Sequence, residues 1–193
     1  MSVRPKLAPE DQMTVEEFLA FTGTRPDEER WELIEGVPIL NASPVDFHQI
    51  VVSNLIFVLR TQKVQTGAIW LPMPGTGTRV PISPNSLPQP DVLVKVGPLT
   101  GGPDTDDARV LFEVLSKSND KADQAWRRRV YASIPNCQHY VTVSLKAVDV
   151  TVYDRTAAWA ARSVTAIGGV LELPALGLSL SAEDVYRYTP LGA

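Results

Sequence analysis

The stretch that decides the fold spans residues 89–143. It reads QPDVLVKV, then the Gly-, Pro- and Asp-rich break GPLTGGPDTDDA, then RVLFEVLSKS, NDKADQAWRRRVYASIP and NCQHYVTV. Two apolar runs of strand length are followed by one run of helical length and then by a third strand-like run. This order of strand, strand, helix and strand predicts an α/β domain.

Two acidic residues stand in the apolar runs of this stretch. Asp91 follows Pro90, and the proline-restricted entry favours an extended chain that continues as a strand. Glu113 interrupts a near-continuous apolar run, the pattern of a strand that is covered on both faces. A carboxylate inside such a strand costs several kcal/mol unless it is paired, protonated or bound to a metal. Glu113 therefore needs an explanation that a surface glutamate would not.

The helical run places a cation near these carboxylates. Asp123, Arg127 and Tyr131 recur at i, i+4 and i+8 and therefore share one helix face. Two carboxylates at strand ends beside a basic residue are suited to bind Mg²⁺, which prefers hard oxygen ligands and promotes phosphodiester hydrolysis. The alternative is an ordinary helical ion pair between Asp123 and Arg127, worth about 0.2–0.5 kcal/mol. That alternative leaves Glu113 unexplained.

Segments before this stretch also have clear patterns. Thr14 and Glu17 form a capping box, which predicts a short helix to about residue 21. Two short strands around a turn at Glu35 and Gly36 follow, and the hairpin carries Glu32. Further predicted elements are a long helix over 44–65 with His48 in its first turn, and strands at 67–73 and 78–82.

After the stretch, short alternating runs predict a meander that closes the sheet. The runs cover residues 138–145, 147–154 and 159–165, and a strand-like run with a short terminal helix ends the chain. The break at 97–108 is predicted to be an exposed, mobile connection.

Composition limits the classes of protein that remain. The 193 residues are 44% hydrophobic and 21% charged, which fits a flexible arm at 1–12 and a single globular domain at 13–193. No apolar run reaches the roughly 20 residues of a membrane span, and no secretory leader is visible, so a cytoplasmic location is expected. Cys137 is the single cysteine and the two histidines are His48 and His139, which disfavours disulfides and zinc sites.

The net charge of −4 argues against a globally basic surface that grips nucleic acid. It does not exclude a nuclease, because the basic run 127–129 can contact phosphate locally. A solvated helix face is the alternative reading of that run.

An ordered set of motifs resembles the Uma-two family of restriction-endonuclease-like proteins, within the PD-(D/E)XK nuclease superfamily. The motifs are MTVEEFLAF, RWELIEGVPIL, SPVDFHQIVVSNL, QPDVLV, FEVLSKSNDKADQAWRRRVYASIPNCQHYVTVS, VTVYDR and VLELPALGLSL, which together cover nearly the whole chain. The resemblance implies an α/β restriction-endonuclease-like core with a mixed, curved sheet flanked by helices. It also implies a Mg²⁺ or Mn²⁺ site that cleaves nucleic acid, with DNA favoured, and a homodimer.

The resemblance also implies roles for single residues. Asp91 and Glu113 match the motif carboxylates that bind the metal, and Glu32 matches the acidic residue of the early hairpin. His48 matches a histidine that is frequent at the start of the long helix, and Asp123 falls where the family usually has aspartate. Both are expected to bind substrate.

The chain departs from the superfamily at the lysine. Leu115 occupies the E-x-K position, and Arg127 stands where the family's lysine lies on the following helix, four residues before Tyr131. Arginine keeps the charge but does not readily release a proton. Lys117 and Lys121 are near enough in sequence to substitute.

Two hypotheses follow from these residues. The first is a metal-dependent endonuclease in which Arg127 stabilises the scissile phosphate. The second is a nuclease fold that has lost catalysis and acts as a nucleic-acid-binding or protein-interaction module.

Overall fold

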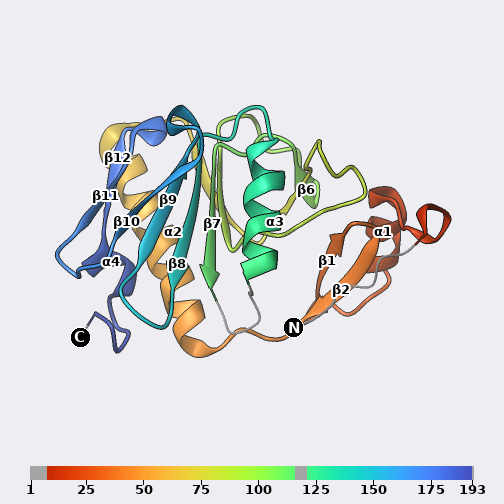
Figure 1. Ribbon diagram of the computed structural model, residues 1–193, viewed down its shortest axis with the longest axis horizontal. Helices are drawn as coiled ribbons and strands as arrows, with labels where there is room; N and C mark the ends of the chain where they lie inside the picture. Colours follow the sequence, from red (N-terminus) through yellow and green to blue (C-terminus); the bar gives the residue numbers. More distant parts are fainter. Residues whose placement is uncertain (1–7, 116–120, 193) are drawn as a thin grey trace.

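A mixed sheet of six strands forms the centre of the computed structural model, which describes residues 8–115 and 121–192 (Figure 1). Its strands are β3 (Leu71–Pro74), β5 (Val92–Lys95), β7 (Val110–Leu115), β8 (His139–Ser144), β9 (Val150–Asp154) and β10 (Ala160–Val164). They lie in the order β10-β9-β8-β7-β5-β3. Only β7 and β8 pair in parallel, and the other neighbours are antiparallel. The predicted α/β architecture with a mixed sheet is confirmed.

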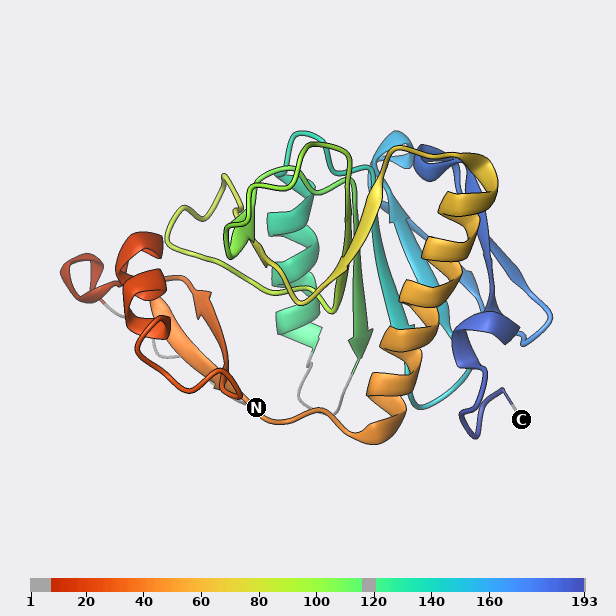
Figure 2. The same ribbon diagram turned by 180° about the vertical axis from the view of Figure 1, so that it is seen from behind.

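Two helices cover opposite faces of this sheet, as Figures 1 and 2 show together. Helix α2 (Asp46–Thr66) packs on the face to which Val110 and Phe112 point, and α3 (Lys121–Ala132) packs on the face of Leu111. Because side chains alternate along a strand, the continuous apolar run of β7 supplies both cores. For this reason the residues on both sides of Glu113 in the sequence are apolar, and polar and apolar residues do not alternate there.

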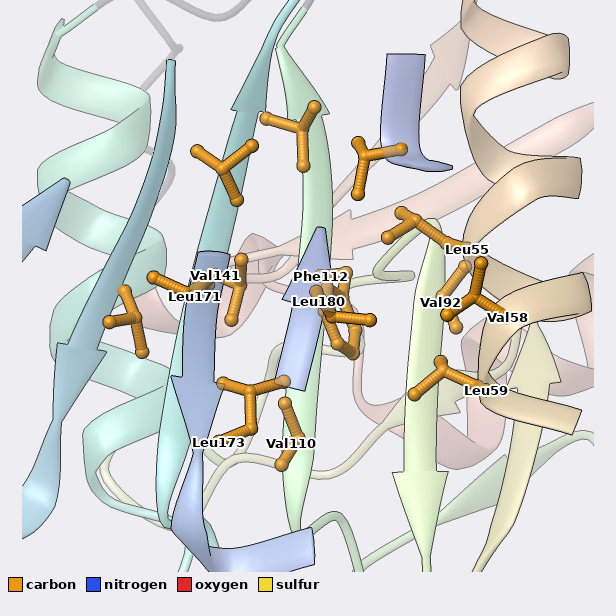
Figure 3. Close-up of a cluster of buried hydrophobic side chains, with 14 of the residues drawn as sticks. Leu55, Val58, Leu59, Val92, Val110, Phe112, Val141, Leu171, Leu173 and Leu180 are labelled. Atoms are coloured by element: carbon orange, nitrogen blue, oxygen red, sulfur yellow. The ribbon is translucent and has the colours of Figure 1, made fainter. Parts of the chain in front are cut away.

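The C-terminal segment completes the core on the α2 face. It folds as β11 (Val170–Leu173), η3 (Pro174–Leu176), β12 (Leu178–Ser181) and α4 (Ala182–Tyr186), and the short turn η2 (Arg155–Ala157) joins β9 to β10. The predicted single strand-like run is thus a hairpin of two strands. Its leucines lie with those of α2 over the sheet (Figure 3). The predicted meander is present as β8, β9 and β10.

A smaller N-terminal unit lies at one end of the sheet (Figure 1). It contains η1 (Pro9–Asp11), α1 (Val15–Thr22), β1 (Arg30–Ile34) and β2 (Val37–Asn41). The predicted capping box of α1 is formed, because Thr14 and Glu17 bond reciprocally. In the turn between β1 and β2, Glu35 has φ 50° and Gly36 has φ 78°. A Cβ on Gly36 would lie 2.4 Å from the Cβ of Gln12, so glycine is required there.

Two predictions about this part of the chain need correction. The strand predicted at 78–82 is wrong: β4 covers only Gly77–Thr78, and it pairs with β6 (Asp104–Thr105). The chain then turns, with Ser83 N bonding Val80 O at 3.0 Å, because Pro81 has no N–H for a sheet ladder. The connection at 97–108, predicted to be exposed and mobile, is partly held in place, since it contains β6 and its last residue, Ala108, is buried.

The N-terminal arm predicted at 1–12 falls mostly outside the described residues, and Pro9–Asp11 form a single 3-10 turn. In the described part of the chain, no helix is both long enough and apolar enough to cross a membrane.

Candidate active site

The two carboxylates singled out in the sequence lie opposite one another on neighbouring strands. Asp91 immediately precedes β5, and Glu113 is the fourth residue of β7. The antiparallel register pairs Val92 with Phe112, which places Asp91 opposite Glu113. The backbone N–H of Val114 donates to Asp91 Oδ2 at 2.8 Å and fixes that side chain. The fold therefore brings together two groups that are distant in the sequence.

Glu113 is buried and holds its proton more tightly than an ordinary glutamate. Its Oε1 accepts hydrogen bonds from Tyr131 OH at 2.8 Å and from Arg127 Nη1 at 2.9 Å. Burial raises the pKa of Glu113 to about 8, and the charges of Asp91 and Glu32 act in the same direction, against the charge of Arg127. At neutral pH this carboxyl is mostly protonated until another cation approaches it.

Arg127 joins the carboxylates from the α3 side. Its Nη2 donates to Glu32 Oε2 at 2.8 Å, its Nη1 to Glu32 Oε1 at 2.9 Å, and its Nε to Asp123 Oδ2 at 3.1 Å. Burial would lower the pKa of Arg127, but the charges of Glu113 and Glu32 raise it well above its usual value. The guanidinium stays charged, so Arg127 cannot accept a proton from water.

Glu32 fastens the N-terminal hairpin to this cluster. Besides the two bonds from Arg127, its Oε1 accepts from Gln89 N at 2.6 Å and its Oε2 from Asn41 Nδ2 at 3.0 Å. Burial alone would raise the pKa of Glu32, but the charge of Arg127 and these hydrogen bonds lower it. Glu32 is therefore ionised, and each of its two carboxylate oxygens accepts two hydrogen bonds.

The geometry limits what Arg127 can do for a substrate. A guanidinium carries five N–H groups. Four of them point at carboxylates: one at Asp123, two at Glu32 and one at Glu113. At most one N–H is left for a phosphate oxygen. In this arrangement, Arg127 mainly compensates charge and holds the carboxylates in place.

The remaining predicted site residues lie at different places. His48 is buried in the first turn of α2, with Nε2 3.2 Å from Asp91 Oδ2 and with Nδ1 lacking a hydrogen-bond partner in the described part of the chain. Asp123 lies beside Arg127. Lys121 is exposed in the first turn of α3, and among residues 8–115 and 121–192 no contact places it at the cluster. Lys117 lies outside the described residues.

Several groups that bind the site carboxylates were not among the predicted site residues, including Asn41 Nδ2 and Val114 N. Two others differ in whether the sequence carries a signal for them. Tyr131 donates its hydroxyl to Glu113, and Gln89 binds Glu32 through its backbone N–H. The spacing of Tyr131 from Arg127 on one helix face was a usable signal for the first. No sequence signal identifies a backbone donor such as that of Gln89.

A cavity of about 390 Å³ opens on the Asp91 side of the cluster. Its polar lining contains Arg30 from β1, Gln49 from α2 and Gln89, together with Asp91 itself. The full lining consists of Asp27, Glu29, Arg30, Gln49, Val52, Pro74, Gly75, Gln89 and Asp91. Asp91 is thus accessible to a ligand, whereas Glu113 lies behind it.

The residues present fit a hard divalent cation that keeps part of its water shell. Among residues 8–115 and 121–192, no group of three or more His, Cys, Asp or Glu side chains is arranged to hold a metal. Asp91 and Glu113 lie close enough that the charge of Asp91 helps to raise the pKa of Glu113. A cation between them would offset this repulsion. Mg²⁺ is commonly held by one or two carboxylates with water as the remaining ligands.

The sheet order, the two covering helices and the paired carboxylates at the β5–β7 end define the class: an α/β protein with a restriction-endonuclease-like core. The sequence profile of the Uma2 family, described as "Putative restriction endonuclease", matches residues 15–183. The chain belongs to this family. No curated protein sequence matches it.

A solved structure supports the same fold. It is the crystal structure of a putative nuclease from Anabaena variabilis ATCC 29413, with a TM-score of 0.70 and 18% sequence identity. The match covers 90% of this chain and 97% of the other. At this identity, the likeness concerns the fold.

Proposed function

We propose that the protein is a metal-dependent endonuclease that hydrolyses phosphodiester bonds in nucleic acid, with DNA the favoured substrate. The observation that carries this proposal is the pair Asp91 and Glu113, which the fold brings together although burial penalises the charge of Glu113. A structural role would be served as well by an apolar residue in β7. The cavity gives a substrate access to Asp91, and Glu113 lies next to Asp91 on the neighbouring strand. From the family resemblance we also propose a cytoplasmic homodimer.

Mg²⁺ or Mn²⁺ would be held by Asp91 and Glu113. When bound, the ion supplies a Lewis acid for the phosphate and lowers the pKa of a coordinated water. The chain's own residues prepare this site. Val114 N and His48 orient Asp91, Tyr131 and Arg127 orient Glu113, and Glu113 releases its proton when the cation is present.

Arg127 acts as a positioning residue in this proposal. It holds Glu32 and Glu113 with a charge that does not change near neutral pH, and it leaves at most one N–H for the scissile phosphate. The proton of the attacking water then has to leave to solvent or to a group that the substrate brings near.

A second candidate function rests on the same arginine. A guanidinium with four of its five N–H groups bound to carboxylates, where the family has a lysine, also fits a fold that binds nucleic acid or protein without cutting. Arg127→Lys distinguishes the two candidates. Cleavage that occurs only in this variant would favour the non-catalytic reading of the natural chain.

Cleavage of plasmid DNA with Mg²⁺ or Mn²⁺ tests the proposal. Asp91→Asn keeps an acceptor for Val114 N but removes the charge, so we expect cleavage to fall by at least ~100-fold, given several kcal/mol of charge stabilisation by the metal. Glu113→Gln is expected to behave alike.

The matched control for this test is Glu172→Gln, which removes a carboxylate from the exposed side of β11 and should cut like the wild type. Equal cleavage by all four proteins, or a wild type inert on duplex and single-stranded DNA and RNA, would contradict the proposal.

A further inference from the structure

A groove of about 950 Å³ runs along the outward face of α2. It shares Gln49, Val52 and Pro74 with the cavity at Asp91, so the groove and the cavity form one continuous depression. Its far end is lined by Val64 and Gln65, near the last residue of α2. The groove therefore leads along the helix toward the candidate catalytic carboxylates.

The charges along this depression change from one end to the other. Asp27, Glu29 and Asp91 line the cavity, where they would attract a cation. Of the described residues that line the groove, none carries a carboxylate, and the single charged side chain is Arg60. In a chain with a net charge of −4, a carboxylate-free groove favours an anionic occupant.

Arg60 is available to such an occupant. Within residues 8–115 and 121–192 it forms no ion pair, and neither does Arg30 at the cavity. By contrast, Arg79, Arg127 and Arg187 are held by carboxylates. One unpaired arginine at the cavity and one along the groove can contact separate phosphates of the same strand.

The groove also presents an aromatic ring to solvent. Phe57 lies one turn before Arg60 on α2, and 69% of its surface is exposed. Ser53, Thr61 and Gln65 add hydroxyl and amide groups along the same face. Exposed aromatic rings that alternate with cations and small polar groups are typical of surfaces that bind single-stranded nucleic acid by base stacking.

We propose that the α2 groove binds single-stranded nucleic acid and directs it to Asp91 and Glu113. Phe57 stacks on an unpaired base and Arg60 contacts a backbone phosphate. A duplex hides its base faces, so the groove prefers a single strand or a frayed end. This inference rests on the proposed nuclease function, because it names the substrate form that the same site would receive.

A second copy of this chain fits the groove less well. A two-fold pairing of α2 with its own copy would bring one Arg60 near the other, and the groove offers no carboxylate to either of them. Like charges at such short range are unfavourable. The apolar side chains Phe57 and Val64 would gain burial in a self-pair, so the experiment includes oligomeric state as an outcome.

Binding is measured without divalent metal, so that cleavage does not interfere. The probes are fluorescein-labelled oligo-dT and a blunt DNA hairpin, followed by fluorescence anisotropy over a salt series. Phe57→Ala should weaken oligo-dT binding by roughly 5- to 100-fold, the range for losing one base–aromatic stack. Arg60→Ala should weaken it and reduce the slope of log K against log salt by about 0.7.

Two exposed positions away from the groove provide matched controls. Leu99→Ala truncates an exposed apolar residue in the connection after β5, and Arg162→Ala removes a charge from β10, the edge strand opposite β3. Both should bind oligo-dT like the wild type. Sedimentation of every variant reports the oligomeric state.

The proposal is overturned if Phe57→Ala and Arg60→Ala bind like the controls, or if the hairpin binds as tightly as oligo-dT. It is also overturned if the variants only change a dimer into a monomer, which would make the groove a self-interface. If the wild type cleaves nothing but its binding still depends on Phe57 and Arg60, the proposed nuclease function is contradicted and the proposed binding groove is supported. If the groove variants cleave and bind like the wild type, the nuclease function is supported and the binding groove is contradicted.

Discussion

At each end of the strands of the central sheet, a buried histidine lies beside an aspartate. The Asp91 end contains His48 and Asp91, and the His139 end contains His139 and Asp154; the residues around the two pairs differ. His48 Nε2 lies 3.2 Å from Asp91 Oδ2, and His139 Nδ1 lies 3.3 Å from Asp154 Oδ2. The parallel register of β7 and β8 pairs Val110 with His139, three residues before Glu113, which is about 10 Å along the sheet.

At the His139 end, the hydrogen bonds of the pair come from the fold itself, although His139 Nδ1, like His48 Nδ1, has no hydrogen-bond partner in the described part of the chain. Ala175 N donates to His139 Nε2 at 3.2 Å, and the N–H and hydroxyl of Thr156 donate to Asp154 Oδ1. The neighbouring Arg155 donates to the backbone carbonyl groups of Ala132 and Ile134. These contacts tie the C-terminal hairpin and the end of α3 to the sheet, so folding accounts for them.

The Asp91 end contains a surplus of acid that folding does not account for. Glu32, Glu113 and Asp123 contact one arginine, and Asp91 lies beside Glu113. Glu113 keeps a pKa of about 8 because burial and like charges outweigh Arg127. A buried histidine–aspartate pair therefore indicates function when the carboxylates around it outnumber the cations and a cavity reaches it.

The largest effect is expected from removing the arginine at the Asp91 end. Arg127→Ala leaves Glu32 and Glu113 buried without their cation, so the free energy of unfolding should fall by about 3–5 kcal/mol. Urea denaturation measures it. Arg127→Lys keeps the charge but loses the two-pronged contact with Glu32, and should lose about 1.5–3 kcal/mol.

The control for this prediction is Arg162→Ala on the exposed edge strand, which loses one exposed hydrogen bond to the carbonyl of Glu172 and should cost about 1 kcal/mol or less. A loss below about 1 kcal/mol in Arg127→Ala would show that the ion pairs of Arg127 with Glu32 and Glu113 contribute little to stability despite their short distances.

The second effect concerns pH and metal at Glu113. Its pKa is raised from 4.5 to about 8 in the folded chain, so its contribution to stability is complete below pH 4.5 and is lost as the pH rises through about 8. We expect the metal-free protein to lose up to a few kcal/mol over this range. The lowered pKa of Glu32 acts in the opposite sense and only as the pH falls below its usual value of 4.5.

Mg²⁺ should restore this stability most strongly above pH 8, where no proton competes for Glu113. A concentration of 100 times Kd corresponds to about 2.7 kcal/mol. Thermal unfolding with and without Mg²⁺ at several pH values measures the effect. Glu113→Gln should remove both the pH dependence and most of the response to Mg²⁺, and a variant that keeps both would place the metal elsewhere.

The sequence predicts the strands and helices around this end well, because apolar periodicity is a local signal. It placed α2, β5, β7 and α3, and the unusual position of Glu113 inside a buried strand is what pointed to the candidate site. It failed at 78–82, where tertiary contacts and Pro81 prevent the strand that the residues favour locally. It also could not reveal that Glu32 binds Arg127, since these residues are 95 positions apart and meet only through packing.

The smallest effect is expected at the His139 end, where His139 should titrate as a structural group. Burial lowers the pKa of His139 from 6.5, the charge of Arg162 acts with burial, and Asp154 opposes them. Its stabilising contribution is therefore complete above pH 6.5 and is lost as the pH falls through the lowered pKa, when a proton on Nε2 would displace the N–H of Ala175.

Glu113 titrates with the opposite sign over part of this range, so the effect of His139→Gln is measured in the Glu113→Gln background. In that background, the protein that keeps His139 should lose stability as the pH falls below about 6.5, because its imidazole gains a proton more readily in the unfolded chain. The protein that also carries His139→Gln has no imidazole to titrate there, so its stability should stay level. Urea denaturation at each pH measures both proteins. An equal fall in the two would assign the acid sensitivity to other groups and remove the distinction between the two ends of the sheet.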